Sequence, residues 1–107
     1  MATLKERKYR RYSFQCGVHL QFRTAGGTSQ LDGVTKNVSM GGMLMESASL
    51  IPESVPVIFT MTIAGGQVTS TIVLRGEGEV IRVEPVVADR GFAIALKFAR
   101  PIEWHRV

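Results

Sequence analysis

The feature that most constrains this chain is the alternation of apolar and polar residues along short segments. In residues 14–22, and again in residues 92–98, every second side chain is apolar. Side chains on a β-strand point alternately to opposite faces, so this spacing predicts strands with one buried face. Shorter segments of the same kind predict strands at residues 30–38, interrupted at Gly33, and at 43–46, 57–63, 68–74 and 79–84.

The segments between these strands carry the residues that turns require. Glycine pairs in residues 25–28 and 64–67 predict tight hairpin turns, because glycine tolerates positive φ. Two glycines in residues 75–78 predict a turn or a bulge in this strand, which resumes at residue 79. Residues 47–56 and 85–90 predict irregular connections. Short strands joined in this way, without an amphipathic helix of about ten residues, are typical of an all-β domain.

The length of the chain decides between the all-β architectures. A chain of 107 residues buries a single core, so we expect one compact unit. We predict a small closed antiparallel β-barrel of six to seven strands rather than a two-sheet sandwich, because closure removes exposed sheet edges. Residues 101–107 are compatible with a short C-terminal helical turn.

Charge is distributed very unevenly along the chain. Residues 1–11 hold five basic side chains and one acidic side chain, and the remaining residues hold eight of each. The formal net charge of +4 therefore lies entirely on this N-terminal segment. Like charges this close repel one another until an anion neutralises them. We expect a flexible basic arm over residues 1–11 that binds an anionic partner, followed by the barrel domain over residues 12–107.

Cysteine content and hydropathy bear on the compartment. Cys16 is the single cysteine, so no internal disulfide forms, and its place on the apolar face of the first strand predicts a core residue in a reducing compartment. The basic start is not followed by the apolar run of a secretory signal. The apolar stretches are also far shorter than the about 20 residues of a membrane-spanning helix. We expect a cytoplasmic protein without a transmembrane segment.

Two short motifs carry the functional information. Arg7 and Arg11 form an Arg-x-x-x-Arg pattern just before the first strand. In the turn after the second strand, Asn37, Ser39 and Gly42 form an Asn-x-Ser-x-x-Gly pattern. Each pattern is weak alone, but their order and their positions relative to the strands are specific. The pair resembles the PilZ domain, the bacterial receptor module for cyclic di-GMP. The resemblance covers most of the chain, including its closing strand.

The resemblance implies roles for the motif residues. Arg7 and Arg11 would bind guanine and phosphate, because a guanidinium group donates paired hydrogen bonds and stacks on purines. Arg10 is a further candidate for a stacking or phosphate contact, which the match does not require. Asn37, in place of the aspartate often found there, and Ser39 would bond a guanine edge or phosphate. The glycines would leave room for a base. The implied ligand-binding set is Arg7, Arg10, Arg11, Asn37, Ser39, Gly41 and Gly42.

The implied function is that of a sensor without enzymatic activity or a cofactor. Binding of cyclic di-GMP would order the arm and change the surface shown to a downstream effector protein or a fused domain. No set of Cys, His and carboxylate residues has the spacing of metal ligands, so no metal is predicted. The acidic residues are scattered and accompany no recognisable nucleophile and base, which gives catalysis little support.

Three alternatives remain open. The sequence pI of about 9.7 suits a small barrel that binds RNA or single-stranded DNA. Such barrels stack bases on exposed aromatic residues, whereas the strand aromatics here share the register of Val, Leu and Ile, which counts against nucleic acid. The chain also fits a PilZ-like protein-interaction adaptor that binds no nucleotide. Finally, residues 37–42 fit a plain turn, and a turn role and a ligand role are compatible.

Overall fold

The computed structural model describes residues 11–13, 15–64, 71–86 and 90–101, and all regular structure within these ranges is β-strand. Every strand pairing is antiparallel. The all-β antiparallel prediction is therefore confirmed. The strands are β1 (Arg11–Tyr12), β2 (Gly17–Thr24), β3 (Gly27–Ser39), β4 (Gly42–Ser47), β5 (Pro56–Ala64), β6 (Thr71–Pro85) and β7 (Phe92–Phe98).

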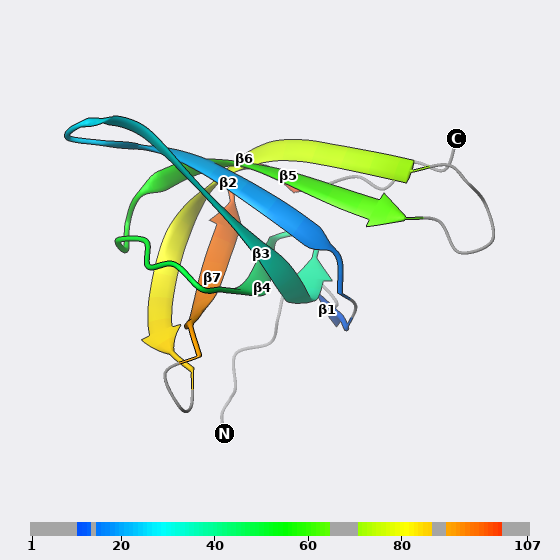
Figure 1. Cartoon of the computed structure of the whole chain (residues 1–107). Coiled ribbons are helices and arrows are strands. Elements are labelled where there is room, and N and C mark those ends of the chain that lie inside the picture. The colour runs from blue at the N-terminus through cyan, green and yellow to red at the C-terminus, as the bar shows by residue number, and fades with distance from the viewer. Residues whose placement is uncertain (1–10, 14, 65–70, 87–89, 102–107) are drawn as a thin grey trace, which may run out of the picture.

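The sheet closes on itself. The strand order is β1-β3-β2-β5-β6-β7-β4, and β4 pairs in turn with β3. Strands β2 to β7 therefore form a closed ring, and β1 is added to β3 outside it, near the start of β4 (Figure 1). This ring-like closure agrees with the closed antiparallel arrangement that the chain length predicts. The β2–β3 hairpin and the β5–β6 pair extend away from the ring in different directions (Figure 1).

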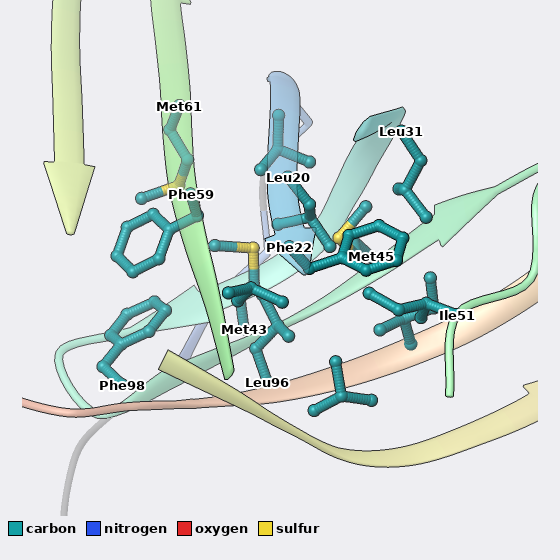
Figure 2. Packing of buried hydrophobic residues seen from close by; sticks show 14 of the residues in the cluster. Leu20, Phe22, Leu31, Met43, Met45, Ile51, Phe59, Met61, Leu96 and Phe98 are labelled. Atoms are coloured by element: carbon teal, nitrogen blue, oxygen red, sulfur yellow. The ribbon is translucent and has the colours of Figure 1, made fainter. Parts of the chain in front are cut away.

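The inner face of the ring forms a single hydrophobic core. Phe59 on β5 stacks on Phe98 on β7, with ring centroids 4.6 Å apart, and Figure 2 shows this pair at one side of a cluster of side chains from several strands. Met43 and Met45 on β4 are buried, and Cys16 packs at the margin of the core, as its place on an apolar strand face predicts. The buried members are Val18, Leu20, Phe22, Leu31, Val38, Met43, Met45, Ile51, Val57, Phe59, Met61, Val80, Ile94, Leu96 and Phe98.

Strand β3 runs without a break through Gly33, so the predicted interruption there is wrong. At Gly33 the strand pairs with β2 and β4 at the same time. A Cβ atom on Gly33 would overlap the carbonyl oxygen of Glu46 on β4. Glycine is needed because it lets β4 approach β3 where the ring closes. The irregularity in β3 is instead a bulge between Thr35 and Asn37.

Strand β6 is one long strand, without the turn or bulge that was predicted at residues 75–78. Its pairing with β5 is unbroken through residues 75–78, so the glycines there do not turn the chain. A Cβ atom on Gly76 would lie 2.6 Å from the ring of Phe59, so this glycine makes room for an aromatic side chain. The bulge in β6 occurs further along, in the pairing with β7 between Val80 and Arg82.

The connections between β2 and β3 and between β4 and β5, which the structure describes, follow the predictions. A tight turn at Ala25 and Gly26 joins β2 to β3, and the irregular connection between β4 and β5 contributes Ile51 to the core. The helical turn expected after Pro101 and the tip of the β5–β6 hairpin lie outside the described residues. Within the described ranges, no helix has the length and hydropathy that crossing a membrane requires.

Replacing Gly33 by alanine tests the close approach of β3 and β4. The added methyl group would overlap the backbone of β4, and overpacking of this kind costs about 1–3 kcal/mol. We expect Gly33→Ala to lower the free energy of unfolding in urea by about that amount. Gly17→Ala is the matched control, because nothing lies within 4 Å of the added Cβ at that strand position. Equal losses in the two variants would contradict the explanation.

Candidate functional site

The end of the basic segment lies beside the second motif. Strand β1 pairs with the end of β3, with Arg11 opposite Ser39 and Tyr12 opposite Val38. Residues directly opposite each other in an antiparallel pair project to the same face of the sheet. Residues from two motifs that are far apart in the sequence therefore share one face.

The bulge in β3 determines which face this is. Between Thr35 and Asn37 the register with β4 shifts by one residue, so that Lys36 is the extra residue. An extra residue reverses which positions of a strand face the core. Thr35 is fully buried before the bulge, and Val38 is buried after it. Asn37 and Ser39 consequently lie together on the outer face of the ring.

Ser39 organises the turn between β3 and β4. Its hydroxyl oxygen accepts a hydrogen bond from the Gly41 N–H at 3.1 Å, and its hydroxyl group donates to the Gly42 carbonyl oxygen at 3.4 Å. The Gly41 carbonyl oxygen accepts a hydrogen bond from the backbone N–H of Phe98 at 2.9 Å, which anchors the turn to β7. Ser39 is only 9% exposed. It therefore has a structural role in this turn.

Gly42 is required by the packing of β4 on β7. It pairs with Lys97, and a Cβ atom on Gly42 would overlap the carbonyl oxygen of Leu96. The contact between two strands thus explains why glycine occupies this position. The suggested role of Gly41 and Gly42 in admitting a base remains a prediction.

Asn37 differs from Ser39, because no described residue forms a hydrogen bond with its side chain. Its side chain is half-buried, and in the part of the chain that the structure describes its amide makes no hydrogen bond. A side-chain amide offers two donor hydrogens and an acceptor oxygen. Asn37 therefore presents hydrogen-bonding groups at the outer face that a ligand can use.

Five of the seven residues singled out by the motifs lie at the junction of β1, β3 and β4. Arg7 and Arg10 fall outside the described residues. Contact between this group and a ligand stays a prediction. The residues at the junction are Arg11, Asn37, Ser39, Gly41 and Gly42.

The sequence did not indicate that Lys97 borders this junction. Alternation along β7 places Lys97 on the polar face of its strand, but it does not tell which strand lies beside the turn. The structure pairs Lys97 with Gly42. That pairing joins two segments far apart in the chain, so a pattern within one segment cannot reveal it.

A hollow of about 910 Å³ lies at the mouth of the ring, and Lys97, which borders the junction, is one of its lining residues. Its lining also includes the core residues Phe22, Val57 and Phe98, but none of the motif residues. The candidate site is therefore an open face of the sheet and not a cavity. Among the described residues, no group of three or more His, Cys, Asp or Glu side chains is placed to hold a metal ion.

The family model of the PilZ domain matches residues 5–104. The chain belongs to the PilZ domain family. The match includes both motifs, so the segment with Arg7 and Arg11 is part of the PilZ domain as the family defines it. A search of curated proteins finds no significant match.

Solved structures share the fold of this PilZ domain at low sequence identity. The inhibitor of motility MotI/DgrA of Bacillus subtilis matches with a TM-score of 0.73 and 15% identity, over 92% of this chain and 45% of that chain. The PilZ domain of YcgR from Escherichia coli, solved with c-di-GMP, matches with a TM-score of 0.59 and 18% identity, over 89% and 79%. The MrkH–c-di-GMP complex of K. pneumonia gives 0.62 and 13%, over 89% and 45%. The chain thus spans less than half of MotI/DgrA and of MrkH.

Alanine substitutions test whether Ser39 stabilises the turn and Asn37 does not. Ser39→Ala leaves the Gly41 N–H without its partner in a partly buried turn, which costs about 1–3 kcal/mol. Asn37→Ala breaks no hydrogen bond within the described residues and should change the free energy of unfolding by less than about 0.5 kcal/mol. Urea unfolding of both variants measures the difference. A Ser39→Ala protein as stable as wild type would contradict the structural role.

Proposed function

We propose that this PilZ domain binds cyclic di-GMP on the outer face of the junction between β1, β3 and β4. The observation that supports the proposal most is the register of β1, which sets Arg11 opposite Ser39. One residue from each motif then lies on the same face. Neither motif by itself requires its residues to lie on the same face as those of the other motif. A ligand that contacts both motifs does require it.

The ligand offers groups that match the motif residues. Arg7 and Arg11 bind guanine O6 and N7 or a phosphate through their guanidinium groups, and Arg10 adds a stacking or phosphate contact. The amide of Asn37 bonds a guanine edge, where donors and acceptors alternate. Its half-buried position holds the amide at a fixed depth beside the strand.

The hydrogen bonds of Ser39 narrow its role. A hydroxyl group has one donor hydrogen and two acceptor lone pairs. The donor is directed to the Gly42 carbonyl oxygen, and one lone pair accepts from the Gly41 N–H. The remaining lone pair suits an N–H donor, so we assign Ser39 to a guanine amino or ring N–H group. A phosphate oxygen would require the hydroxyl to leave Gly42.

Signal relay follows from the small size of β1. This strand has two residues, lies outside the closed ring, and leaves Tyr12 52% exposed. Ligand contacts to Arg11 would hold β1 against β3 and neutralise the basic residues before it. The changed surface would then be read by an effector protein or a fused domain. A cytoplasmic location, which the single cysteine indicates, is part of this proposal.

The described strands do not favour the nucleic-acid alternative. Phe22, Phe59 and Phe98 are buried in the core, so these strand aromatics offer no platform for stacking bases. The adaptor alternative makes the opposite prediction for cyclic di-GMP, namely no binding. A single titration therefore separates the leading function from the adaptor.

Isothermal titration with cyclic di-GMP tests the proposed function. We expect saturable binding, and a loss of about 10- to 100-fold in affinity for Arg7→Ala or Arg11→Ala, because each removes a charged hydrogen bond. Asn37→Ala should also weaken binding without loss of stability. Arg75→Ala is the matched control, since it removes the same charge from an exposed position on β6. Its affinity should equal that of wild type.

The outcomes distinguish the alternatives. A folded wild-type protein that ignores cyclic di-GMP would support the adaptor. If Arg7→Ala and Arg11→Ala both bind as wild type, the assigned roles are wrong. A steep loss of affinity for an RNA oligonucleotide with rising salt, in the absence of cyclic di-GMP binding, would support the nucleic-acid alternative.

A further inference from the structure

The outer face beside the motifs continues across the ring to β6. Asn37 is paired with Leu44 on β4, Leu44 with Ala95 on β7, and Ala95 with Arg82 on β6. These four residues form one row that crosses the sheet. Neighbouring strands lie about 4.8 Å apart, so the row spans about 14 Å along the sheet. The row leads from the motif residue Asn37 to Arg82, which is exposed.

A second row begins at the turn. Gly42 on β4 is paired with Lys97 on β7, and Lys97 with Glu79 on β6. Lys97 is exposed, and its neighbour Gly42 has no side chain. The ammonium group can therefore reach over the turn without a bulky side chain in between.

The outer face between Asn37 and Arg82 is lined by Gly42, Leu44 and Ala95, and we call this part of the face the floor. Gly42 contributes only backbone, Ala95 contributes a methyl group, and Leu44 is half-buried. Small residues beside long ones leave a flat, weakly polar strip on a sheet. Such a strip accommodates the face of a purine, whose edges are polar and whose faces are not.

The charges around the floor are arranged by strand. Arg11 lies on the β1 side, and Lys97 and Arg82 lie on the β7 and β6 side. Acidic residues also occur on this face. Glu79 lies opposite Lys97, and Glu84 forms an exposed ion pair with Arg82 at 3.5 Å. Exposed pairs of this kind are weak, so Arg82 is able to exchange its partner for a ligand.

A further cation, Lys36, lies near this face and forms an ion pair. Lys36, the extra residue of the bulge, lies 4.0 Å from Glu46. This pair faces Ala93, the partner of Glu46 on β7. Both exposed pairs, Lys36 with Glu46 and Arg82 with Glu84, are weak, so pairing does not distinguish the two cations. Arg82 is the cation that shares a row with Asn37, Leu44 and Ala95.

From this arrangement we infer that the ligand site has a second basic edge, formed by Lys97 and Arg82. The inference rests on the proposed binding of cyclic di-GMP. That ligand carries two guanines and two phosphates, and Arg11, the described arginine of the first motif, lies on the β1 side of the face. Lys97 contacts a phosphate as a compact charge, and Arg82 stacks its planar guanidinium group on a guanine. Ala95 forms the floor between them.

Titration of charge variants with cyclic di-GMP tests the second edge. We expect Lys97→Gln and Arg82→Ala each to weaken binding by about tenfold, which corresponds to the loss of one charge-assisted contact. Lys97→Arg keeps the charge and should restore most of the affinity. Arg75→Ala, on the part of β6 that does not pair with β7, removes one charge and should have no effect.

A substitution on the floor gives an independent readout. Ala95→Leu adds bulk on the outer face, so we expect it to weaken binding at least tenfold while leaving the urea unfolding midpoint close to that of wild type. If Lys97→Gln and Arg82→Ala bind as wild type while Arg11→Ala is weakened, the second edge is wrong and the proposed function stands. An equal loss in Arg75→Ala would also overturn the second edge, because it would indicate general charge attraction. Absence of wild-type binding would overturn the proposed function itself.

Discussion

The pairing of β3 with β4 is the contact on which the rest of the structure depends. It closes the ring, and it is possible only because Gly33 leaves room for the backbone of β4. The same pairing contains the bulge that turns Asn37 and Ser39 to the outer face. Closure of the core and orientation of the candidate site are thus two results of one strand contact.

This arrangement places a polar site on a rigid support. The turn after β3 is tied to β7 through the carbonyl oxygen of Gly41, and the core behind it holds the stacked rings of Phe59 and Phe98. A ligand on the outer face therefore meets backbone and side chains in fixed positions. The two-residue strand β1 lies outside the ring, and it is the element through which binding would be relayed.

Much of this could be predicted from the sequence, because alternation and turn chemistry are local. The buried positions of Met43 and Met45 and the β2–β3 turn follow directly from such patterns. Gly33 and Gly76 indicate a break in a strand when only the sequence is considered, but both lie within continuous strands. A glycine that breaks a strand and a glycine that makes room for a neighbouring group cannot be distinguished from the sequence alone. Only the paired strand shows which case applies.

The candidate site could also be predicted from the sequence only in part. The motifs identified the turn and the basic segment, and their meeting at Arg11 and Ser39 agrees with a shared site. Lys97 and Arg82 lie on strands whose neighbours are set by ring closure, so no spacing within the sequence associates them with Asn37. Likewise, only the hydrogen bonds of Ser39 show that it stabilises the turn as well as being a candidate ligand contact.

The central claim is that residues from both motifs hold one ligand molecule on the outer face of the β1–β3–β4 junction. A crystal structure of the full chain with cyclic di-GMP tests this most directly. We predict that the guanidinium group of Arg11 and the side-chain amide of Asn37 lie within hydrogen-bonding distance of the same ligand. A ligand seated instead in the hollow at the mouth of the ring, with Arg11 and Asn37 not in contact with it, would contradict the claim.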